Sequence, residues 1–170
     1  MTALLKPLNA LARALLVVAG VALVAMMCVT IFDVLLRNFG NYFDALRDVR
    51  FYGSIEMVRY LFLVAMAGTM PWGVEKSQVV VELFTQKLPE STRQRIDAFF
   101  LLGFTVFGAA MAYSLFQAGV HAVATGETTP DLGLPLSWTR YVASFCMALM
   151  AVRALCLGIQ GLRQGDLHVA

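Results

Sequence analysis

Four long apolar segments, separated by polar stretches, dominate the pattern of hydrophobic and polar positions along the chain. A helix that crosses a hydrocarbon core of about 30 Å needs roughly 20 predominantly apolar residues. The pattern therefore predicts four membrane-spanning helices, at residues of about 14–36, 54–74, 97–123 and 136–160. The second span reaches this length only if charged residues near its start are included in it.

The first apolar segment also has features of a cleaved secretion signal, because Lys6 and Arg13 precede it. Its uncharged stretch runs from Ala14 to Phe32 and is longer than the roughly 7–15 apolar residues of a signal peptide. No small-residue cleavage site of the A-x-A type follows it. We therefore expect a retained membrane anchor.

Charged residues are confined to the ends of the predicted spans. The fourth span is apolar apart from Arg140 and Arg153, one near each end. Long arginine stems at span ends can extend the guanidinium group to the lipid headgroups, and we expect both residues to do so. No Asp, Glu, Lys or His lies at the middle of any span, where transporters and channels normally place such a group.

The composition places the chain among membrane proteins. Hydrophobic residues make up 59% of the sequence and charged residues only 14%, against about 25% charged in soluble domains. The mean hydropathy is +0.73. The net charge of +2 is too small to indicate a nucleic-acid partner, and the three cysteines lie in apolar segments without metal-ligand spacing. We predict an all-α integral membrane protein with one four-helix domain, residues 1–170.

The distribution of lysine and arginine predicts the orientation in the membrane. With the N-terminus in the cytoplasm, eight of the 13 basic residues fall in cytoplasmic segments and five in outer ones. We therefore predict that both termini are cytoplasmic. The Pro-rich stretch from Gly126 to Tyr141 then faces outward, which agrees with its having no basic residue before Arg140.

The polar connection between the second and third spans contains a second helical pattern. It predicts a short amphipathic helix at about residues 77–88, which Pro89 ends. The apolar positions, spaced i, i+3, i+4 and i+8, are Val80, Leu83, Phe84 and Leu88. Such a helix lies either in the membrane interface or against protein, and the sequence leaves both alternatives open.

Two pairs of opposite charges lie on the same side of the membrane in this prediction. Asp33 and Arg37 are spaced i, i+4 at the end of the first span. Glu56 and Arg59 are spaced i, i+3 at the start of the second. Each pair shares a helix face, and together the four residues could form a neutral network that locks the two spans. The functional alternative is a contact point for another membrane subunit.

The sequence contains no pattern that is typical of a catalytic, phosphate-binding or metal-binding site. No nucleophile–base arrangement, Gly-rich phosphate loop or metal-ligand spacing is present, so we predict no enzyme, no catalytic or metal site and no cofactor. A haem-binding anchor usually supplies two histidines within its spans. Here His121 lies at a span edge and His168 in the C-terminal tail. A haem or quinone anchor of an oxidoreductase, and a self-assembling exporter, are therefore weaker alternatives.

Three segments carry a family resemblance. In order, "FDVLLRNFG", "EMVRYLFLVAMAGTMPWGVEKSQVVVELFTQKLP" and "TPDLGLPLSWTRYVASF" resemble the small membrane subunit of tripartite ATP-independent periplasmic (TRAP) transporters, the DctQ-like family. The matching positions are Asp33, Val34, Arg37, Glu56, Leu88, Pro89, Thr129, Pro130, Leu132, Gly133 and Pro135. One departure is Gln78, which stands where the family often has a histidine.

The resemblance implies a scaffold subunit in the bacterial inner membrane. Its partners would be a large transport subunit, a periplasmic solute-binding protein and membrane lipid, in a sodium-driven symporter that imports an organic acid such as a dicarboxylate or sugar acid. The candidate docking loop for the binding protein comprises Thr129, Pro130, Asp131, Leu132, Gly133 and Pro135. Alternatively, Pro135 simply starts the fourth helix. The residues that choose the solute would lie in other chains.

Overall fold

The computed structural model describes residues 2–39, 53–76 and 90–164. This part of the chain forms four helices, α1 (Thr2–Phe39), α2 (Ser54–Lys76), α4 (Glu90–Thr125) and α5 (Leu136–Gln164). Each is long and apolar enough to cross a membrane. The prediction of an all-α protein with four membrane-length helices is therefore confirmed. The amphipathic helix predicted at 77–88 lies outside the described residues.

The helix boundaries agree with the hydropathy pattern to different degrees. The helices α2 and α5 begin at the predicted residues, Ser54 and Leu136. The helix α1 already begins at Thr2 and α4 at Glu90, well before the spans expected from about residues 14 and 97. Hydropathy locates only the part of a helix that suits hydrocarbon. The Ala- and Leu-rich stretch before the first span favours helix and extends α1 beyond it.

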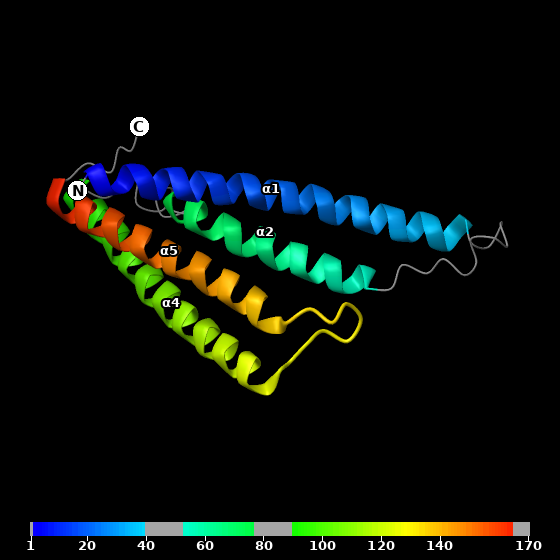
Figure 1. The fold of residues 1–170 in the computed structure, drawn as a ribbon. Helices are drawn as coiled ribbons and strands as arrows, with labels where there is room; N and C mark the ends of the chain where they lie inside the picture. Colours follow the sequence, from blue (N-terminus) through cyan, green and yellow to red (C-terminus); the bar gives the residue numbers. More distant parts are fainter. Residues whose placement is uncertain (1, 40–52, 77–89, 165–170) are drawn as a thin grey trace.

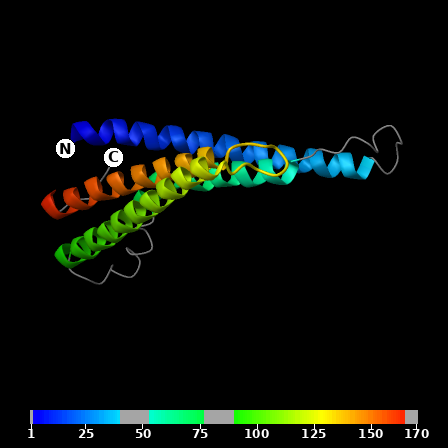
Figure 2. The same cartoon turned by 60° about the horizontal axis from the view of Figure 1, so that its bottom comes forward.

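The four helices form two antiparallel pairs that lie side by side (Figure 1). One pair is α1 with α2, the other is α4 with α5, and α2 and α5 make the main contact between the pairs. The start of α1 and the end of α5 lie at the same end of the molecule, while the α4–α5 loop, residues 126–135, lies at the other (Figures 1 and 2).

Small residues allow the helices of each pair to approach closely. A Cβ added to Gly68 of α2 would lie 3.1 Å from the Leu15 carbonyl oxygen of α1. A Cβ added to Gly108 of α4 would lie 3.1 Å from the Ala151 Cβ of α5. Such close backbone approach is typical of helix packing in membranes, where van der Waals contact replaces the hydrophobic driving force.

The helix α5 is the central element of the fold. It contributes to both buried apolar clusters in the described part of the chain. One cluster joins Leu101 of α4 to Met150 of α5. The other joins Ala67 of α2 to Ala143 and Cys146 of α5. The buried residues of α5 therefore hold the two helix pairs together.

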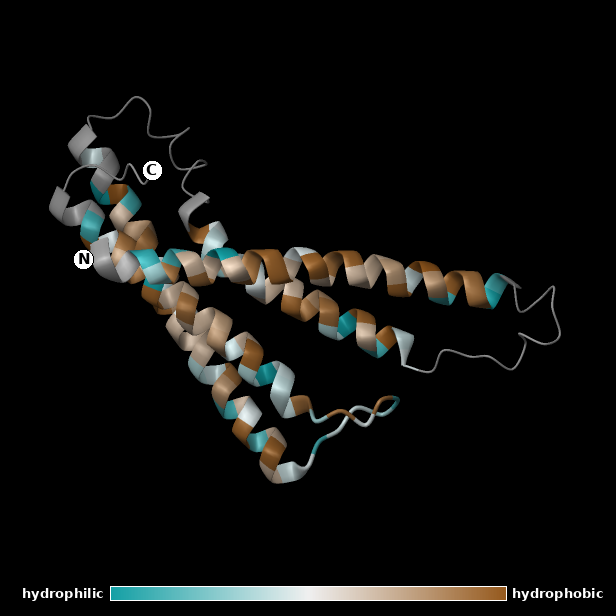
Figure 3. Ribbon diagram, turned by 45° about the horizontal axis from the view of Figure 1, so that its top comes forward, coloured by the Kyte–Doolittle hydropathy of each residue, from teal (hydrophilic) through white to brown (hydrophobic). Residues whose placement is uncertain are grey.

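The outer surfaces of the helices are apolar, as expected for helices that face lipid. Large exposed hydrophobic side chains line α1 and α4, among them Val21 (64% exposed), Phe99 (74%) and Val106 (70%). Figure 3 shows hydrophobic residues along the length of α1. This arrangement agrees with four helices that satisfy their backbone polar groups internally within a bilayer.

Candidate functional site

The α4–α5 loop folds into a compact turn instead of an open connection. The Thr129 N–H donates to the Leu134 carbonyl at 2.9 Å, and the Leu134 N–H donates to the Thr129 hydroxyl oxygen at 3.0 Å. Gly133 closes the turn at a φ of +64°, a left-handed conformation that favours glycine. Thr129 is buried, so the side chain that organises the turn is shielded from solvent.

The C-terminal side of the loop leads directly into α5. Pro135 pairs with Thr128 in an isolated antiparallel bridge, and the Leu136 N–H donates to the Glu127 carbonyl at 3.1 Å. The helix α5 begins at Leu136, so Pro135 immediately precedes it. This position agrees with proline's fixed φ, which suits the start of a helix. Pro135 thus takes part in both the turn and the helix start.

Glu56, near the start of α2, reaches across to this loop. One carboxylate oxygen accepts the Asp131 N–H at 3.1 Å and the other accepts the Leu132 N–H at 3.0 Å. Glu56 is only 7% exposed. A carboxylate that accepts two backbone N–H groups makes charge-assisted hydrogen bonds, which are stronger than neutral ones. Glu56 therefore anchors the loop to α2, and Figure 2 shows the loop beside the start of that helix.

A second contact between the loop and α2 is apolar. Gly53 directly precedes α2, and its carbonyl accepts the Met57 N–H at 2.9 Å. A Cβ added to Gly53 would lie 2.8 Å from the Leu132 Cγ and Cδ2 atoms, so the Leu132 side chain packs directly on the glycine. Gly53 also adopts a φ of +88°, which disfavours any larger residue. Glycine is therefore required here by both packing and backbone conformation.

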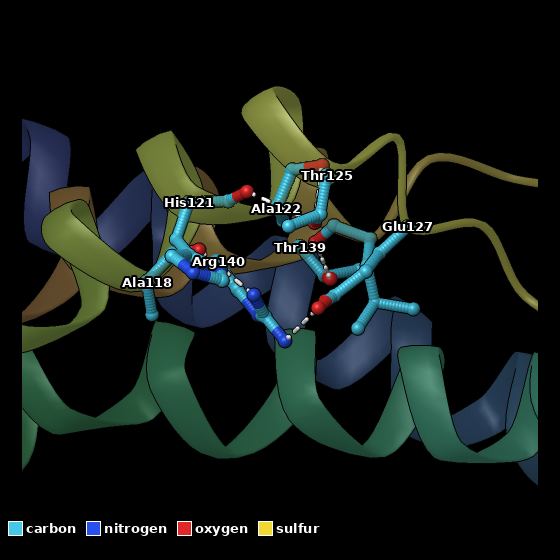
Figure 4. A network of polar contacts seen from close by, with 8 residues as sticks. Ala118, His121, Ala122, Thr125, Glu127, Thr139 and Arg140 are labelled. Carbon is cyan, nitrogen blue, oxygen red and sulfur yellow. Dashed lines mark hydrogen bonds and ion pairs between the residues drawn. The ribbon is translucent and has the colours of Figure 1, made fainter.

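Arg140 ties the loop to the end of α4 (Figure 4). Its Nη2 lies 3.0 Å from a carboxylate oxygen of Glu127, and its Nη1 donates to the Ala118 carbonyl at 2.7 Å. The Glu127 side chain is 41% exposed, so this ion pair contributes little to stability. Its role is geometric, because the ion pair and the Ala118 bond together link Arg140, near the start of α5, to the loop and to α4.

Arg153 of α5 is the buried charge that the sequence analysis placed wrongly. We expected it to extend to the headgroups, yet it is 0% exposed. Its Nη1 donates to the Pro71 carbonyl of α2 at 2.7 Å and its Nε donates to the Asn9 side-chain oxygen of α1 at 3.1 Å. Partners on two neighbouring helices make burial possible, because a buried charge must be hydrogen-bonded.

An indole ring completes this site. The Trp72 ring centroid lies 4.9 Å from the Arg153 guanidinium carbon and 5.5 Å from that of Arg13. Both distances are in the range of cation–π contacts. We refer to Arg13, Trp72 and Arg153 as the arginine–tryptophan cluster. It joins α1, α2 and α5 at the end of the molecule opposite the α4–α5 loop.

The four predicted charged residues are not joined into one network in the described structure. Asp33 and Arg37 form an ion pair, with 3.1 Å between Nε and a carboxylate oxygen. Glu56 bonds to the α4–α5 loop instead of to α1. Arg59 is exposed. The four predicted apolar positions of the amphipathic helix, Val80, Leu83, Phe84 and Leu88, lie outside the described residues.

Sequence reasoning missed two features of the polar interior. Arg153 and Asp97 are both buried, Asp97 at 5% exposure. A sequence signal existed, because each is a charge within or beside an apolar helix, where pairing inside the bundle is common.

The described residues contain no group of three or more His, Cys, Asp or Glu residues that could hold a metal ion. His121 is exposed. The described arrangement therefore consists of hydrogen bonds that join the helices and a loop that is held in a compact turn.

Comparison with known protein families gives a clear result. The family model described as "Tripartite ATP-independent periplasmic transporters, DctQ component" matches residues 26–164, which is most of the chain. No curated protein and no solved structure matches the chain. The matched region includes Glu56, the α4–α5 loop and Arg153.

Proposed function

This chain belongs to the DctQ component family of the tripartite ATP-independent periplasmic transporters, and we propose that it acts there as the scaffold subunit that braces the large transport subunit. The family match over residues 26–164 is the single observation that carries this proposal. A scaffold also agrees with the structure, in which the described polar interior consists of contacts between helices.

We propose that the complete transporter is a sodium-driven symporter in the bacterial inner membrane. The family description agrees with this, since an ion gradient can drive uptake that does not use ATP, and "periplasmic" indicates a bacterial envelope. An organic acid, such as a dicarboxylate or sugar acid, is the proposed solute. The partners are a large membrane subunit and a periplasmic solute-binding protein. The distribution of basic residues supports cytoplasmic termini.

The α4–α5 loop is the proposed contact for the binding protein. Its residues Thr129, Pro130, Asp131, Leu132, Gly133 and Pro135 form the turn or border it. The two hydrogen bonds from the loop to Glu56 support this role, because they hold the loop in one conformation before any partner arrives. Preorganisation reduces the entropy lost on binding. Pro130 and Asp131 are exposed and so accessible to a partner.

Glu56→Gln tests the docking role against a matched variant, Glu127→Gln. The first replaces one of the carboxylate oxygens that hold the loop to α2, and the second removes an exposed charge within the loop that makes no bond to α2 in the described part of the chain and whose ion pair contributes little to stability. Affinity of the periplasmic binding protein for the reconstituted transporter is the measurement. We expect Glu56→Gln to weaken binding several-fold more than Glu127→Gln. Equal affinities would remove the loop from the docking proposal.

Three further assignments remain proposals. The pair Asp33–Arg37 is proposed to contact the large subunit or to stabilise α1, and its exposed arginine supports the first role. A double variant, Asp33→Arg with Arg37→Asp, that assembles normally with the large subunit would remove the case that these two charges make a specific contact.

The segment 77–88 is proposed as an interfacial helix. All 170 residues are proposed to form one membrane domain, which the contacts between the two helix pairs support.

Co-purification tests the scaffold role itself. A tagged chain, expressed with its large subunit and extracted in mild detergent, should retain that subunit in a stable complex. Deletion of the chain should abolish solute uptake in cells, and re-expression should restore it. A large subunit that assembles and transports at full rate without this chain would overturn the proposal. Nothing in the described residues favours the alternative of a haem or quinone anchor.

A further inference from the structure

The outer face of α1 carries two basic side chains for which the scaffold role gives no use. Lys6 and Arg13 are both exposed. They are seven residues apart, nearly two turns of a helix with 3.6 residues per turn, so they share one face about 10 Å apart along the axis. Ala10, exposed between them, has a side chain too small to fill the gap. The two charges therefore border an open strip of helix surface.

Arg13 differs from Arg153 in how its charge is satisfied. Arg153 donates hydrogen bonds to Asn9 and to the Pro71 carbonyl. The described contact of Arg13 is with the face of Trp72 alone. A guanidinium group has five N–H donors, and a ring face does not satisfy them all. Because Trp72 also faces Arg153, two positive charges meet around one indole ring, and an anion beside Arg13 would offset their repulsion.

The position of Trp72 sets the depth of Arg13 in the membrane. The candidate span of α2 runs from Ser54 to Val74, so Trp72 lies near its end. Tryptophan is enriched at the level of the lipid headgroups. Arg13 contacts that ring and therefore lies at about the depth of lipid phosphate groups. Lys6, nearly two turns toward the start of α1, lies further out.

An apolar strip continues from Arg13 toward the membrane interior. Val17, Val21 and Val24 recur on α1 at helical spacing, and they are 62%, 64% and 62% exposed. Gly20, beside them, has nothing within 4 Å of an added Cβ. One continuous face of α1 thus presents Arg13 at headgroup depth, Lys6 nearly two turns further out, and a β-branched apolar strip below them. A phospholipid has the same order of polar and apolar parts.

We propose that this face of α1 binds an anionic phospholipid. The phosphate lies between Lys6 and Arg13, and an acyl chain follows Val17, Val21 and Val24. A zwitterionic lipid brings its own ammonium group to a basic surface, whereas an anionic lipid does not, so charge favours the anionic class. This inference is independent of the transport role, because it depends only on residues of this chain.

Trp72 provides the probe for a direct test. The chain has two tryptophans, so a Trp138→Phe background leaves Trp72 as the only one. The purified full-length chain is mixed with phospholipids whose acyl chains carry bromine, which quenches indole fluorescence on contact. Brominated phosphatidylglycerol is compared with brominated phosphatidylcholine at equal mole fraction. We expect phosphatidylglycerol to compete for the site about fivefold better for each basic side chain that it contacts.

Variants of the two cations identify the site. Arg13→Gln should reduce the preference for phosphatidylglycerol about fivefold, whereas Arg13→Lys should keep most of it. Lys6→Gln, at an exposed position nearly two turns from Arg13, gives the same test while leaving the Arg13 contact with Trp72 in place. The matched control is Arg37→Gln, which removes an exposed cation near the other end of α1, where Asp33 pairs with it. It should leave the preference at Trp72 unchanged.

Three results would overturn the proposal. The first is equal quenching by the two lipids, as expected if this face meets bulk lipid without selecting its headgroup. The second is a preference that survives both the Arg13→Gln and the Lys6→Gln substitutions. The third is loss of the preference on adding inorganic phosphate but not chloride of equal ionic strength, which would assign the site to soluble phosphate.

Discussion

Substitution of Asn9 by alanine tests whether the buried arginine holds the helix pairs together. The Asn9 side-chain oxygen accepts the Arg153 Nε–H at 3.1 Å, and this bond joins α1 to α5. Alanine removes the acceptor without adding bulk. The bond of Arg153 to the Pro71 carbonyl and its contact with Trp72 remain. The variant therefore removes one contact of a fully buried charge and retains the others.

The expected destabilisation follows from this geometry. A buried donor left without its acceptor costs about 1–3 kcal/mol, and the charge on Arg153 favours the upper half of that range. Alanine has a higher helix propensity than asparagine, which offsets roughly 0.5 kcal/mol. The net loss is about 2 kcal/mol. For a chain of this size that corresponds to a fall in Tm of about 4–8 °C.

Thermal unfolding of the purified chain in detergent, followed by far-ultraviolet circular dichroism, is the measurement. The matched control is Asn38→Ala, the same substitution near the other end of α1, where the side chain is exposed. We expect the control to unfold within about 1 °C of the parent chain. If Asn9→Ala and Asn38→Ala have equal Tm values, Arg153 does not depend on Asn9, and its role as a joint between α1 and α5 is refuted.

Two further substitutions test other contacts. Glu56→Gln should increase the rate of hydrogen exchange roughly tenfold at the two loop amides that donate to its carboxylate. Glu127→Gln should leave that rate unchanged. Equal exchange rates in the two variants would show that Glu56 does not anchor the loop. Gly108→Ala places a Cβ within 2.9–3.2 Å of α5 atoms and should lower stability by about 1–3 kcal/mol. In the control Gly103→Ala the added Cβ meets nothing within 4 Å, so this variant should be neutral or stabilising. The free energy of unfolding of both variants is measured by denaturant titration. Equal values would contradict the close packing of α4 on α5.

The fold could be predicted because the membrane imposes it. Apolar length fixes where a helix can cross, so the starts of α2 and α5 at Ser54 and Leu136 agree with the pattern. The early starts of α1 and α4 could not be read from hydropathy. Those extensions leave the apolar segment, and hydrogen bonding along the helix continues independently of the hydropathy of the side chains.

The polar contacts were harder to predict, because they depend on how the helices pack. The sequence showed that Glu56 and Arg153 are charges near span ends. It could not show that Glu56 would bond to loop amides more than 70 residues away, or that Arg153 would meet Asn9 of α1. Spacing along one helix predicts neighbours only within that helix, which is why it succeeded for Asp33 and Arg37.

Solute flux in proteoliposomes tests the central claim that this chain braces a transporter and does not itself carry solute. Vesicles with an inward sodium gradient would receive this chain alone, the large subunit alone, or both, each with the loaded binding protein outside. We expect sodium-dependent uptake of a labelled organic acid only when both membrane chains are present. Uptake by vesicles that contain this chain alone would contradict the account.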